Sequence, residues 1–257
     1  MPRHTGPRAL TEYIVNQSQQ KIKKGSITLL MQGILAGLYI SIGAIASLKL
    51  SSSIITPGLG DFLGALVFPL GIIAILIMQA ELFTSDCMVM TSVYVGSTKI
   101  SKVIRVLFLI IASNMIGGII AAFFTRTSGV FNQATIELVI DKALYKAHMP
   151  IGQLFTSAIL CNIIVCTGVC LAYNCKEEFA KITVLWLAIV VFVLSGTEHV
   201  VANMYYLFVA LFYGAQLTVK GVFYNLSISA VGNFIGGGVI VSGINYLISN
   251  SNIESRY

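Results

Sequence analysis

Two long apolar stretches of the chain are interrupted, one by Glu81-Leu82-Phe83-Thr84-Ser85-Asp86 and the other by Glu198-His199-Val200-Val201-Ala202-Asn203. Both interruptions place ionisable side chains between flanks that are strongly apolar. Inside a membrane, non-helical backbone is tolerated only where protein or a water-filled cavity surrounds it. The two breaks therefore predict a protein-lined path through a membrane.

The composition requires a membrane setting for these breaks. The chain has 257 residues, of which 56% are hydrophobic and only 10% are charged, and its mean hydropathy is +0.87. Soluble domains carry about 25% charged residues, so a soluble enzyme is excluded, and the apolar content excludes disorder. The net charge of +6 comes from basic residues that lie between apolar runs. Membrane topology explains them, so we expect a lipid bilayer and no nucleic acid as partner.

Stretches free of Lys, Arg, Asp and Glu predict six membrane-spanning helices. Each core is long enough to cross roughly 30 Å of hydrocarbon as a helix, which predicts an all-α integral membrane protein. The second and fifth spans are the two that contain a break. The six stretches are 25–48, 62–80 continuing as 87–98, 106–125, part of 147–175, 182–197 continuing as 199–219, and part of 221–253.

The placement of Lys and Arg predicts the orientation. If six spans leave both ends on one side, eleven basic residues, from Arg3 to Arg256, fall on that side and five on the other. The positive-inside rule then predicts a multi-pass protein of the cytoplasmic (inner) membrane with both termini cytoplasmic. The polar and basic segment from Leu10 to Lys24 predicts a short amphipathic helix at the membrane surface.

An internal repeat divides the chain into halves. The third and sixth spans carry the same pattern, N-x-I-G-G, at 114–118 and 233–237, offset by 119 residues. The two breaks both place Asp or Asn five residues after a Glu, offset by 117 residues. Coincidence between apolar helices is the alternative explanation, but the two offsets agree in register. Two repeats of three spans each would be inverted in the membrane, with a site near the midplane at the broken helices.

This repeat predicts the domain organisation. We expect a cytoplasmic amphipathic N-terminal segment and a cytoplasmic C-terminus at the two ends of the chain. Between them we expect two three-span repeats joined by an extracytoplasmic loop. The five predicted segments are 1–24 (N-terminal segment), 25–125 (first repeat), 126–151 (connecting loop), 152–253 (second repeat) and 254–257 (C-terminus).

Each break predicts a half-helix that restarts inside the membrane. Thr84, Ser85 and Asp86 are suitable N-cap residues for a half-helix starting near Cys87, and Asn203 is one for a half-helix starting near Met204. The free N–H groups and positive dipole end of such a helix attract negative charge. Two of them directed at one point would favour an anion.

Four ionisable side chains lie within these breaks. Such groups are costly in a membrane and are functional candidates by default. For Glu81 and Glu198 we favour a structural role, in which the carboxylates hold the loops by accepting backbone N–H bonds, and Asp86 is grouped with them. His199 is the only histidine in the deep apolar region. We expect a pore-facing, proton-exchanging role for it, and a buried histidine with satisfied hydrogen bonds is the alternative.

The five cysteines do not predict a metal site. No C-x-x-C pair occurs, and four of the five lie on or beside one apolar run. A single helix cannot surround a tetrahedral metal ion, so buried, reduced cysteines are expected, with no metal and no cofactor.

At the two breaks the sequence resembles the formate/nitrite transporter family, pentameric channels for formate, nitrite or hydrosulfide. The resemblance rests on Ala80-Glu81-Leu82-Phe83-Thr84, on Gly196-Thr197-Glu198-His199-Val200-Val201-Ala202-Asn203-Met204, and on the two Asn-containing Gly-Gly elements. It covers essentially the whole chain. It implies an aquaporin-like protomer with the second and fifth helices broken, a homopentamer, and one pore in each protomer.

The resemblance also implies roles for individual residues. Leu82, Phe83 and Thr84 would lie near a cytoplasmic-side constriction. An outer constriction would be formed by Phe68 and Phe192, with Ile72 farther in, although composition alone would place all three in helix packing. Lys146 would be the basic residue of the outer path, Asn162 a polar residue facing it, and His199 the central histidine. Formate-type members usually carry an aromatic residue before Glu-His, and Thr197 at that position favours the hydrosulfide branch.

The predicted function is a membrane channel for small monovalent weak-acid anions. Hydrosulfide is favoured, with formate and nitrite as alternatives, and the anion would be neutralised near His199 between two apolar constrictions. A proton-coupled secondary formate/nitrite transporter would use the same residues. An aquaporin would carry two NPA motifs, and none occurs; an ammonium channel would carry paired intramembrane histidines. A membrane enzyme would require a nucleophile–base or metal constellation, so no enzymatic activity is expected.

Overall fold

The computed structural model describes residues 6–54, 56 and 58–254, and every regular element within them is helical. The expectations for Arg3 and Arg256, and for most of the C-terminal segment 254–257, lie outside the described residues. The first half contains α1 (Pro7–Lys23), α2 (Ser26–Ser52), α3 (Leu59–Val67), α4 (Leu70–Met78), α5 (Phe83–Asp86), the 3₁₀ helix η1 (Cys87–Met90), α6 (Thr91–Tyr94) and α7 (Ile100–Thr127). The second contains α8 (Gln133–Ala147), α9 (Ile151–Asn174), α10 (Glu178–Leu194), α11 (Val200–Phe212), α12 (Val219–Phe234), the π-helix η2 (Ile235–Val241) and α13 (Ser242–Glu254).

The long apolar helices confirm the membrane fold. Within the described residues, five helical stretches are long and apolar enough to cross a membrane: Ser26–Ser52, Leu59–Met78, Ile100–Thr127, Ile151–Asn174 and Val219–Asn250. They coincide with the predicted first, second, third, fourth and sixth spans. The predicted fifth span is made of two shorter helices, α10 and α11, which are separated at the second break. The first break separates α4 from α5.

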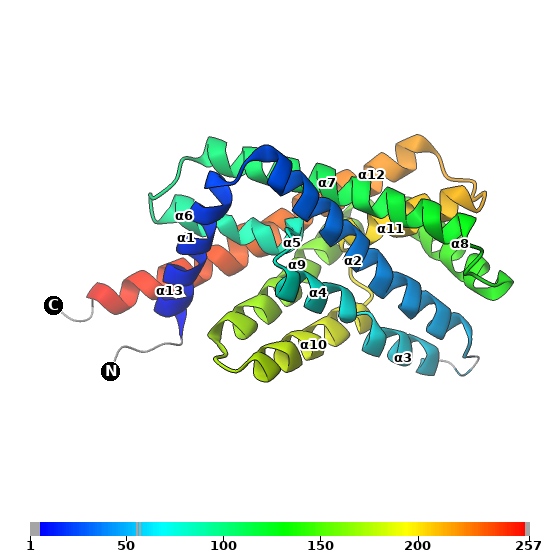
Figure 1. The fold of residues 1–257 in the computed structure, drawn as a ribbon, viewed down its shortest axis with the longest axis horizontal. Helices are drawn as coiled ribbons and strands as arrows, with labels where there is room; N and C mark the ends of the chain where they lie inside the picture. Colours follow the sequence, from blue (N-terminus) through cyan, green and yellow to red (C-terminus); the bar gives the residue numbers. More distant parts are fainter. Residues whose placement is uncertain (1–5, 55, 57, 255–257) are drawn as a thin grey trace.

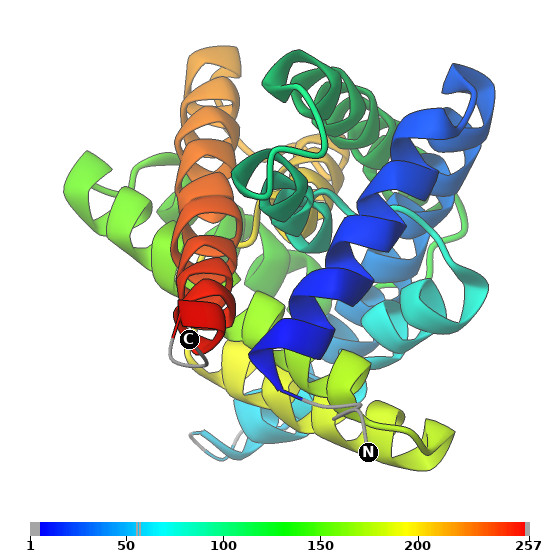
Figure 2. The same cartoon turned by 90° about the vertical axis from the view of Figure 1, so that its left-hand side faces the viewer.

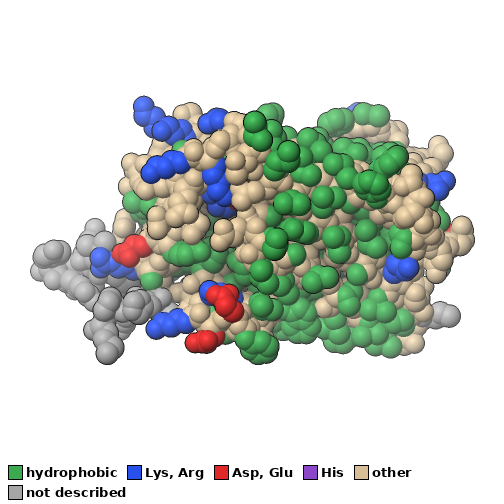
Figure 3. All heavy atoms as spheres, viewed as in Figure 1, with side chains coloured by type: hydrophobic (Ala, Val, Ile, Leu, Met, Phe, Trp, Pro, Cys, Tyr) green, Lys and Arg blue, Asp and Glu red, His purple; other side chains and the backbone are tan. Residues whose placement is uncertain are grey.

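The surface agrees with this arrangement. Both termini lie at one end of the long axis, and α8 lies at the other (Figure 1). Hydrophobic side chains cover a broad band between the two ends, while Lys and Arg gather toward the ends (Figure 3). Many large apolar side chains are exposed, among them Phe108, Phe124 and Leu187. Apolar exposure on this scale is typical of contact with lipid or with other subunits.

The long helices of each half pack in the same way. α2 packs closely against α7, and α9 against α12 and η2. A Cβ atom on Gly37 would meet the backbone of Asn114 and Gly117 in α7, and a Cβ on Gly236 would meet Ile159 of α9. Small residues at these crossings let the backbones touch, which is the packing expected of membrane helices. Gly33 with Gly37, and Gly232 with Gly236, each form a GxxxG pair at these crossings.

Two amphipathic elements cover the ends of the bundle. α1 lies across the end that carries both termini, next to α13 and α6 (Figures 1 and 2). α8 lies at the opposite end and packs against α11 and α2. α1 immediately precedes the first long helix of its half, and α8 immediately precedes the first long helix of the other half. Each half also packs this short helix against its broken span, since α1 contacts η1 and α6, and α8 contacts α11.

Candidate functional site

A buried asparagine organises the first break. The side-chain oxygen of Asn114, in α7, accepts a hydrogen bond of 2.9 Å from the backbone N–H of Phe83, the first residue of α5. Its amide nitrogen donates to the carbonyls of Gly33 and Glu81, both at 2.9 Å. Asn114 is fully buried. One side chain thus ties the loop and the restarting helix to α2 and α7.

The second break is held by the equivalent asparagine. Asn233, in α12, accepts from the N–H of Val200 at 2.9 Å and donates to the carbonyls of Ala158 (2.7 Å) and Glu198 (2.9 Å). It is fully buried as well. Asn114 and Asn233 are the first residues of the two N-x-I-G-G patterns. The sequence echo therefore corresponds to one structural device used in both halves.

This device corrects the predicted N-caps. The half-helices begin at Phe83 and Val200, so Thr84, Ser85 and Asp86 lie inside α5 and Asn203 lies in the first turn of α11. The first amide of each half-helix is bonded to an asparagine from another span. The first half-helix has no local side-chain cap, and the second is also capped locally by His199, whose ring accepts from the N–H of Ala202, so neither helix uses the polar residues that the local pattern indicated.

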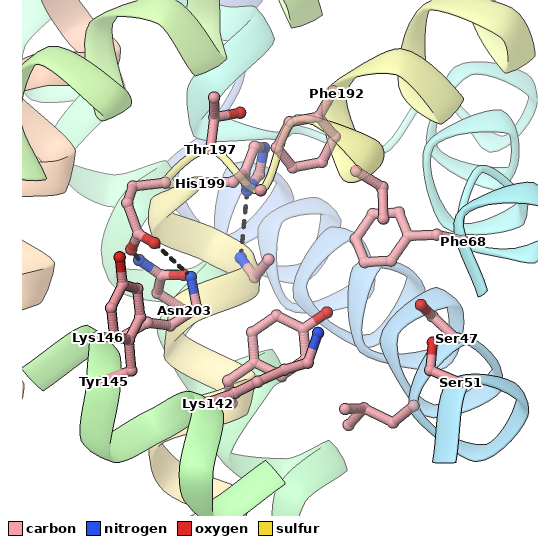
Figure 4. A pocket seen from close by; sticks show the side chains of 16 residues that line it. Ser47, Ser51, Phe68, Lys142, Tyr145, Lys146, Phe192, Thr197, His199 and Asn203 are labelled. Atoms are coloured by element: carbon pink, nitrogen blue, oxygen red, sulfur yellow. Dashed lines mark hydrogen bonds and ion pairs between the residues drawn. The ribbon is translucent and has the colours of Figure 1, made fainter. Parts of the chain in front are cut away.

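The two breaks meet at a threonine–histidine pair. Thr84 Oγ1 lies 3.0 Å from His199 Nε2, and both side chains are buried. His199 Nδ1 accepts a hydrogen bond of 3.2 Å from the N–H of Ala202, as Figure 4 shows. A ring nitrogen that accepts carries no proton, so the imidazole is neutral with its proton on Nε2. His199 therefore donates to Thr84.

An aromatic pair stands on one side of His199. The ring centroids of Phe68 and Phe192 are 6.0 Å apart, and those of Phe192 and His199 are 5.4 Å apart. The structure thus places Phe68, Phe192 and His199 next to one another. These three residues border a cavity of about 240 Å³ that is also lined by Lys142, Tyr145 and Lys146 of α8 (Figure 4); we call it the outer cavity.

A charged network closes one wall of the outer cavity. Lys146 Nζ donates to Glu198 Oε1 at 2.6 Å, and Glu198 Oε2 accepts from the amide nitrogens of Asn203 (2.7 Å) and Asn225 (3.3 Å). The Asn225 amide also donates to the Lys146 carbonyl at 3.0 Å. Glu198 is therefore a loop-structuring residue, but lysine and amide side chains hold its carboxylate where backbone N–H groups were expected. Asn225 was missed, and its only signal was a polar residue in the apolar sixth span.

A second cavity, of about 200 Å³, lies on the α1 side of the breaks and is lined by Ile72, Ile75, Glu81, Lys21 and Tyr173 among others; we call it the inner cavity. Lys21 and Lys24 of the N-terminal segment donate to Glu81 at 2.5 and 2.7 Å, and Lys21 also contacts Asp86. The carboxylates of Glu81 and Asp86 are therefore held by lysines, again in place of the expected backbone N–H groups. Lys21 and Lys24 were interpreted only as topology signals.

The charge state of Lys21 follows from this cluster. Burial disfavours its ammonium group most strongly, but the adjacent carboxylates of Asp86 and Glu81 outweigh that effect and raise its pKa. Lys21 therefore stays charged and tethers α1 to the first break. Lys146 tethers α8 to the second break in the same way, so each half supplies a lysine from the short helix that precedes its first span.

One expectation about the outer path needs correction. Asn162 was expected to face Lys146, but its amide nitrogen donates to the carbonyls of Thr84 (3.0 Å) and Asn233 (2.6 Å). The amide that meets the Lys146 segment belongs to Asn225. Asn162 thus connects the two breaks, because α9 passes between α5 and α12. Leu82 and Phe83 are buried, and Ile72 borders the inner cavity.

Lys21→Gln is expected to loosen α1 from the first break, because it leaves the carboxylate of Asp86 without its lysine partner. Breaking a buried ion pair costs roughly 3 kcal/mol or more, and part of that cost disappears if α1 detaches. Limited chymotrypsin digestion in detergent should then cut after Tyr13 in α1 several-fold faster, at a site that the substitution leaves intact. The matched control is Lys23→Gln, on the same helix but outside the cluster. Equal cleavage rates in the two variants would contradict the tether.

A cavity on each side of two broken helices, inside a bundle of long apolar helices, defines a multi-pass membrane transport protein. The sequence profile of the Formate/nitrite transporter family matches residues 8–247. The chain therefore belongs to the formate/nitrite transporter family, and it is a small-anion channel or transporter. This confirms the family resemblance found in the sequence.

Individual relatives agree with this assignment. The chain is 32% identical over 256 residues to the uncharacterized transporter YrhG of Bacillus subtilis (strain 168), covering 97% of this chain and 96% of the relative. It is 31% identical over 204 residues to the formate channel FocA of Haemophilus influenzae, covering 77% of this chain and 72% of that protein. A solved pentameric formate channel with formate bound superposes with a TM-score of 0.77 at 28% identity, covering 88% of this chain and 98% of that one.

Proposed function

We propose that the protein is a channel through which small monovalent weak-acid anions cross the membrane, with hydrosulfide favoured and formate or nitrite as alternatives. One observation carries the proposal. A neutral histidine that donates to Thr84 lies between the outer cavity and the buried first break. The proposal names Phe68, Phe192 and Ile72 as the apolar part of the path and His199 with Thr84 as its polar centre.

The apolar residues favour a weak acid over a permanent anion. Moving an ionised group out of water without a partner costs several kcal/mol or more. Between the two cavities the path passes the Phe68–Phe192 pair and Ile72, none of which offers a hydrogen bond. A weak acid can bind a proton, pass this region as a neutral molecule and ionise on the other side. An anion of a strong acid, such as chloride, lacks that route.

The hydrogen bonds of His199 suggest how neutralisation occurs. Because Nδ1 is bonded to the N–H of Ala202, the ring favours its neutral form. We propose that His199 orients the Thr84 hydroxyl, which holds the passing anion, and that water in the outer cavity gives up the proton and leaves hydroxide in the outer solution. Thr84 accepts from His199, so its own hydroxyl proton remains available to a passing oxygen or sulfur atom. The pair would hold the acid while the proton moves.

The choice of anion rests on Thr197, which lines the outer cavity beside His199. A small polar residue at this position supports hydrosulfide. The names of the relatives favour formate as the competing substrate, since two of them are formate channels, from Haemophilus influenzae and Bacillus thuringiensis. The experiment below decides between them.

We further propose the assembly and orientation that the family assignment suggests. The solved pentameric formate channel supports a pentameric assembly, and we propose a homopentamer with one pore in each protomer. The distribution of Lys and Arg supports a location in the cytoplasmic membrane with both termini cytoplasmic, α1 on the cytoplasmic side and α8 outside. The matching asparagines, Asn114 and Asn233, support two inverted three-span repeats with the boundaries given above.

Proteoliposome flux measurements test the proposed function. We expect non-saturating uptake of hydrosulfide, formate or nitrite between about pH 5 and pH 9, with chloride at least tenfold slower because it cannot be neutralised. If hydrosulfide has the highest flux, the result supports the substrate preference inferred from Thr197. If formate has the highest flux, that preference is overturned, but the weak-acid channel stands. Chloride flux equal to that of the leading weak acid would contradict the mechanism. Saturating flux that accumulates the anion against its gradient would identify a proton-coupled transporter.

A further inference from the structure

We propose that Lys142 recruits the transported anion, holding a small monovalent anion in the outer cavity before it reaches Phe68 and Phe192. Lys142 lies on α8, one helical turn before Lys146. This inference rests on the proposed function and adds to it a residue that decides how often the outer cavity is occupied.

The geometry places Lys142 in the cavity without a partner. Its side chain is half-buried and points into the outer cavity, across from Ser47 and Ser51 of α2 (Figure 4). Within the described part of the chain, no hydrogen bond or ion pair involves its ammonium group, and Asp61 acts on it only over a longer distance. The cavity therefore contains a cation whose counter-charge is missing.

Lys146 cannot take this role in its observed arrangement. Its ammonium group is bonded to Glu198 at 2.6 Å, and that carboxylate is further held by Asn203 and Asn225. The Lys146–Glu198 pair has no net charge, and His199 is neutral by its hydrogen bonds. Among the ionisable residues that line the outer cavity, the excess positive charge belongs to Lys142.

Burial makes an anion favourable at this position. Desolvation lowers the pKa of Lys142, Asp61 opposes that effect, and the nearby Lys146 reinforces it. An anion in the cavity would compensate the ammonium group directly and would relieve the desolvation. The hydroxyl group of Ser47 offers a further hydrogen-bond donor across the cavity, whereas the Ser51 hydroxyl already donates to the Gly60 carbonyl. The site accepts any small monovalent anion, so selectivity for weak acids would remain with the deeper part of the path.

The experiment compares Lys142→Gln with Lys220→Gln in proteoliposomes at low and high ionic strength. Lys220 is exposed on the same side of the protein and does not line the cavity. At low salt and low substrate concentration, we expect the flux of formate and hydrosulfide through Lys142→Gln to be roughly threefold to tenfold lower than through the native protein. At high salt the two fluxes should become equal, because salt screens electrostatic recruitment. Lys142→Arg should retain native flux.

A second measurement detects the anion without transport. Reductive methylation of the native protein, followed by mass spectrometry, should modify Lys142 several-fold more slowly in the presence of sodium formate, while Lys220 is unaffected. Native flux and salt dependence in Lys142→Gln, or methylation of Lys142 that formate does not slow, would overturn the inference. If the native protein carries none of the weak-acid anions, the proposed function fails, and the methylation result still decides whether Lys142 binds an anion.

Discussion

Replacing His199 with phenylalanine is expected to reduce the flux of weak-acid anions at least tenfold. The phenyl ring has a similar shape but removes the Nε2–H donor to Thr84 and the acceptor for the Ala202 N–H. Without His199, the Thr84 hydroxyl loses the partner that orients it toward the passing anion. A hydrogen bond to a charged group contributes about 1.5–3 kcal/mol, and each 1.4 kcal/mol of barrier is about a tenfold change in rate. The measurement is initial uptake of hydrosulfide and formate into proteoliposomes across the pH range used above.

The matched control for this variant is His148→Phe. His148 is the exposed C-cap residue of α8, and within the described residues its ring contacts the Leu144 carbonyl of its own helix. We expect its flux and pH dependence to equal those of the native protein. Thermal unfolding of both variants in detergent checks that neither has lost its fold. A His199→Phe protein with native flux and native pH dependence would show that the histidine is a packing residue only.

Replacing Asn233 with alanine is expected to lower the stability by about 3–5 kcal/mol. The substitution leaves the Val200 N–H and the Glu198 carbonyl without their asparagine partner in a buried region, and it removes the second donor to the Ala158 carbonyl, which lies inside α9. Each buried polar group that loses its partner costs about 1–3 kcal/mol. For a chain of this size the change corresponds to a fall of roughly 10 °C in the unfolding temperature. Asn114→Ala should have a similar effect, because Asn114 makes the same three kinds of bond.

Asn245→Ala is the matched control for both asparagine variants. Asn245 is also an asparagine of the last long helix, but its amide donates only to the Val241 carbonyl of the same helix. Its substitution should shift the unfolding temperature by a few degrees at most. Thermal unfolding of the purified protein in detergent provides the comparison. Equal shifts for Asn233→Ala and Asn245→Ala would contradict the capping role.

The amino-acid sequence alone was sufficient to predict the apolar spans and the two breaks. A membrane requires long uninterrupted apolar helices, so the polar groups at Glu81 and Glu198 are visible against their surroundings in one dimension. The N-x-I-G-G repeat was detectable for the same reason, because an asparagine and a Gly-Gly pair stand out in an apolar helix. His199 was identified because it is the one histidine in the deep apolar region.

Only the tertiary structure decided which residues serve each break. Asn114 caps a helix that begins 31 residues earlier, and Lys21 meets a carboxylate 60 residues away. Local patterns instead pointed to Thr84, Ser85 and Asn203 as caps, and the resemblance pointed to Asn162 as the partner of Lys146. Partners this far apart are selected by how helices cross, and helix crossing depends on packing between surfaces. Sequence periodicity shows which residues share a helix face, but the crossing determines which of them meet.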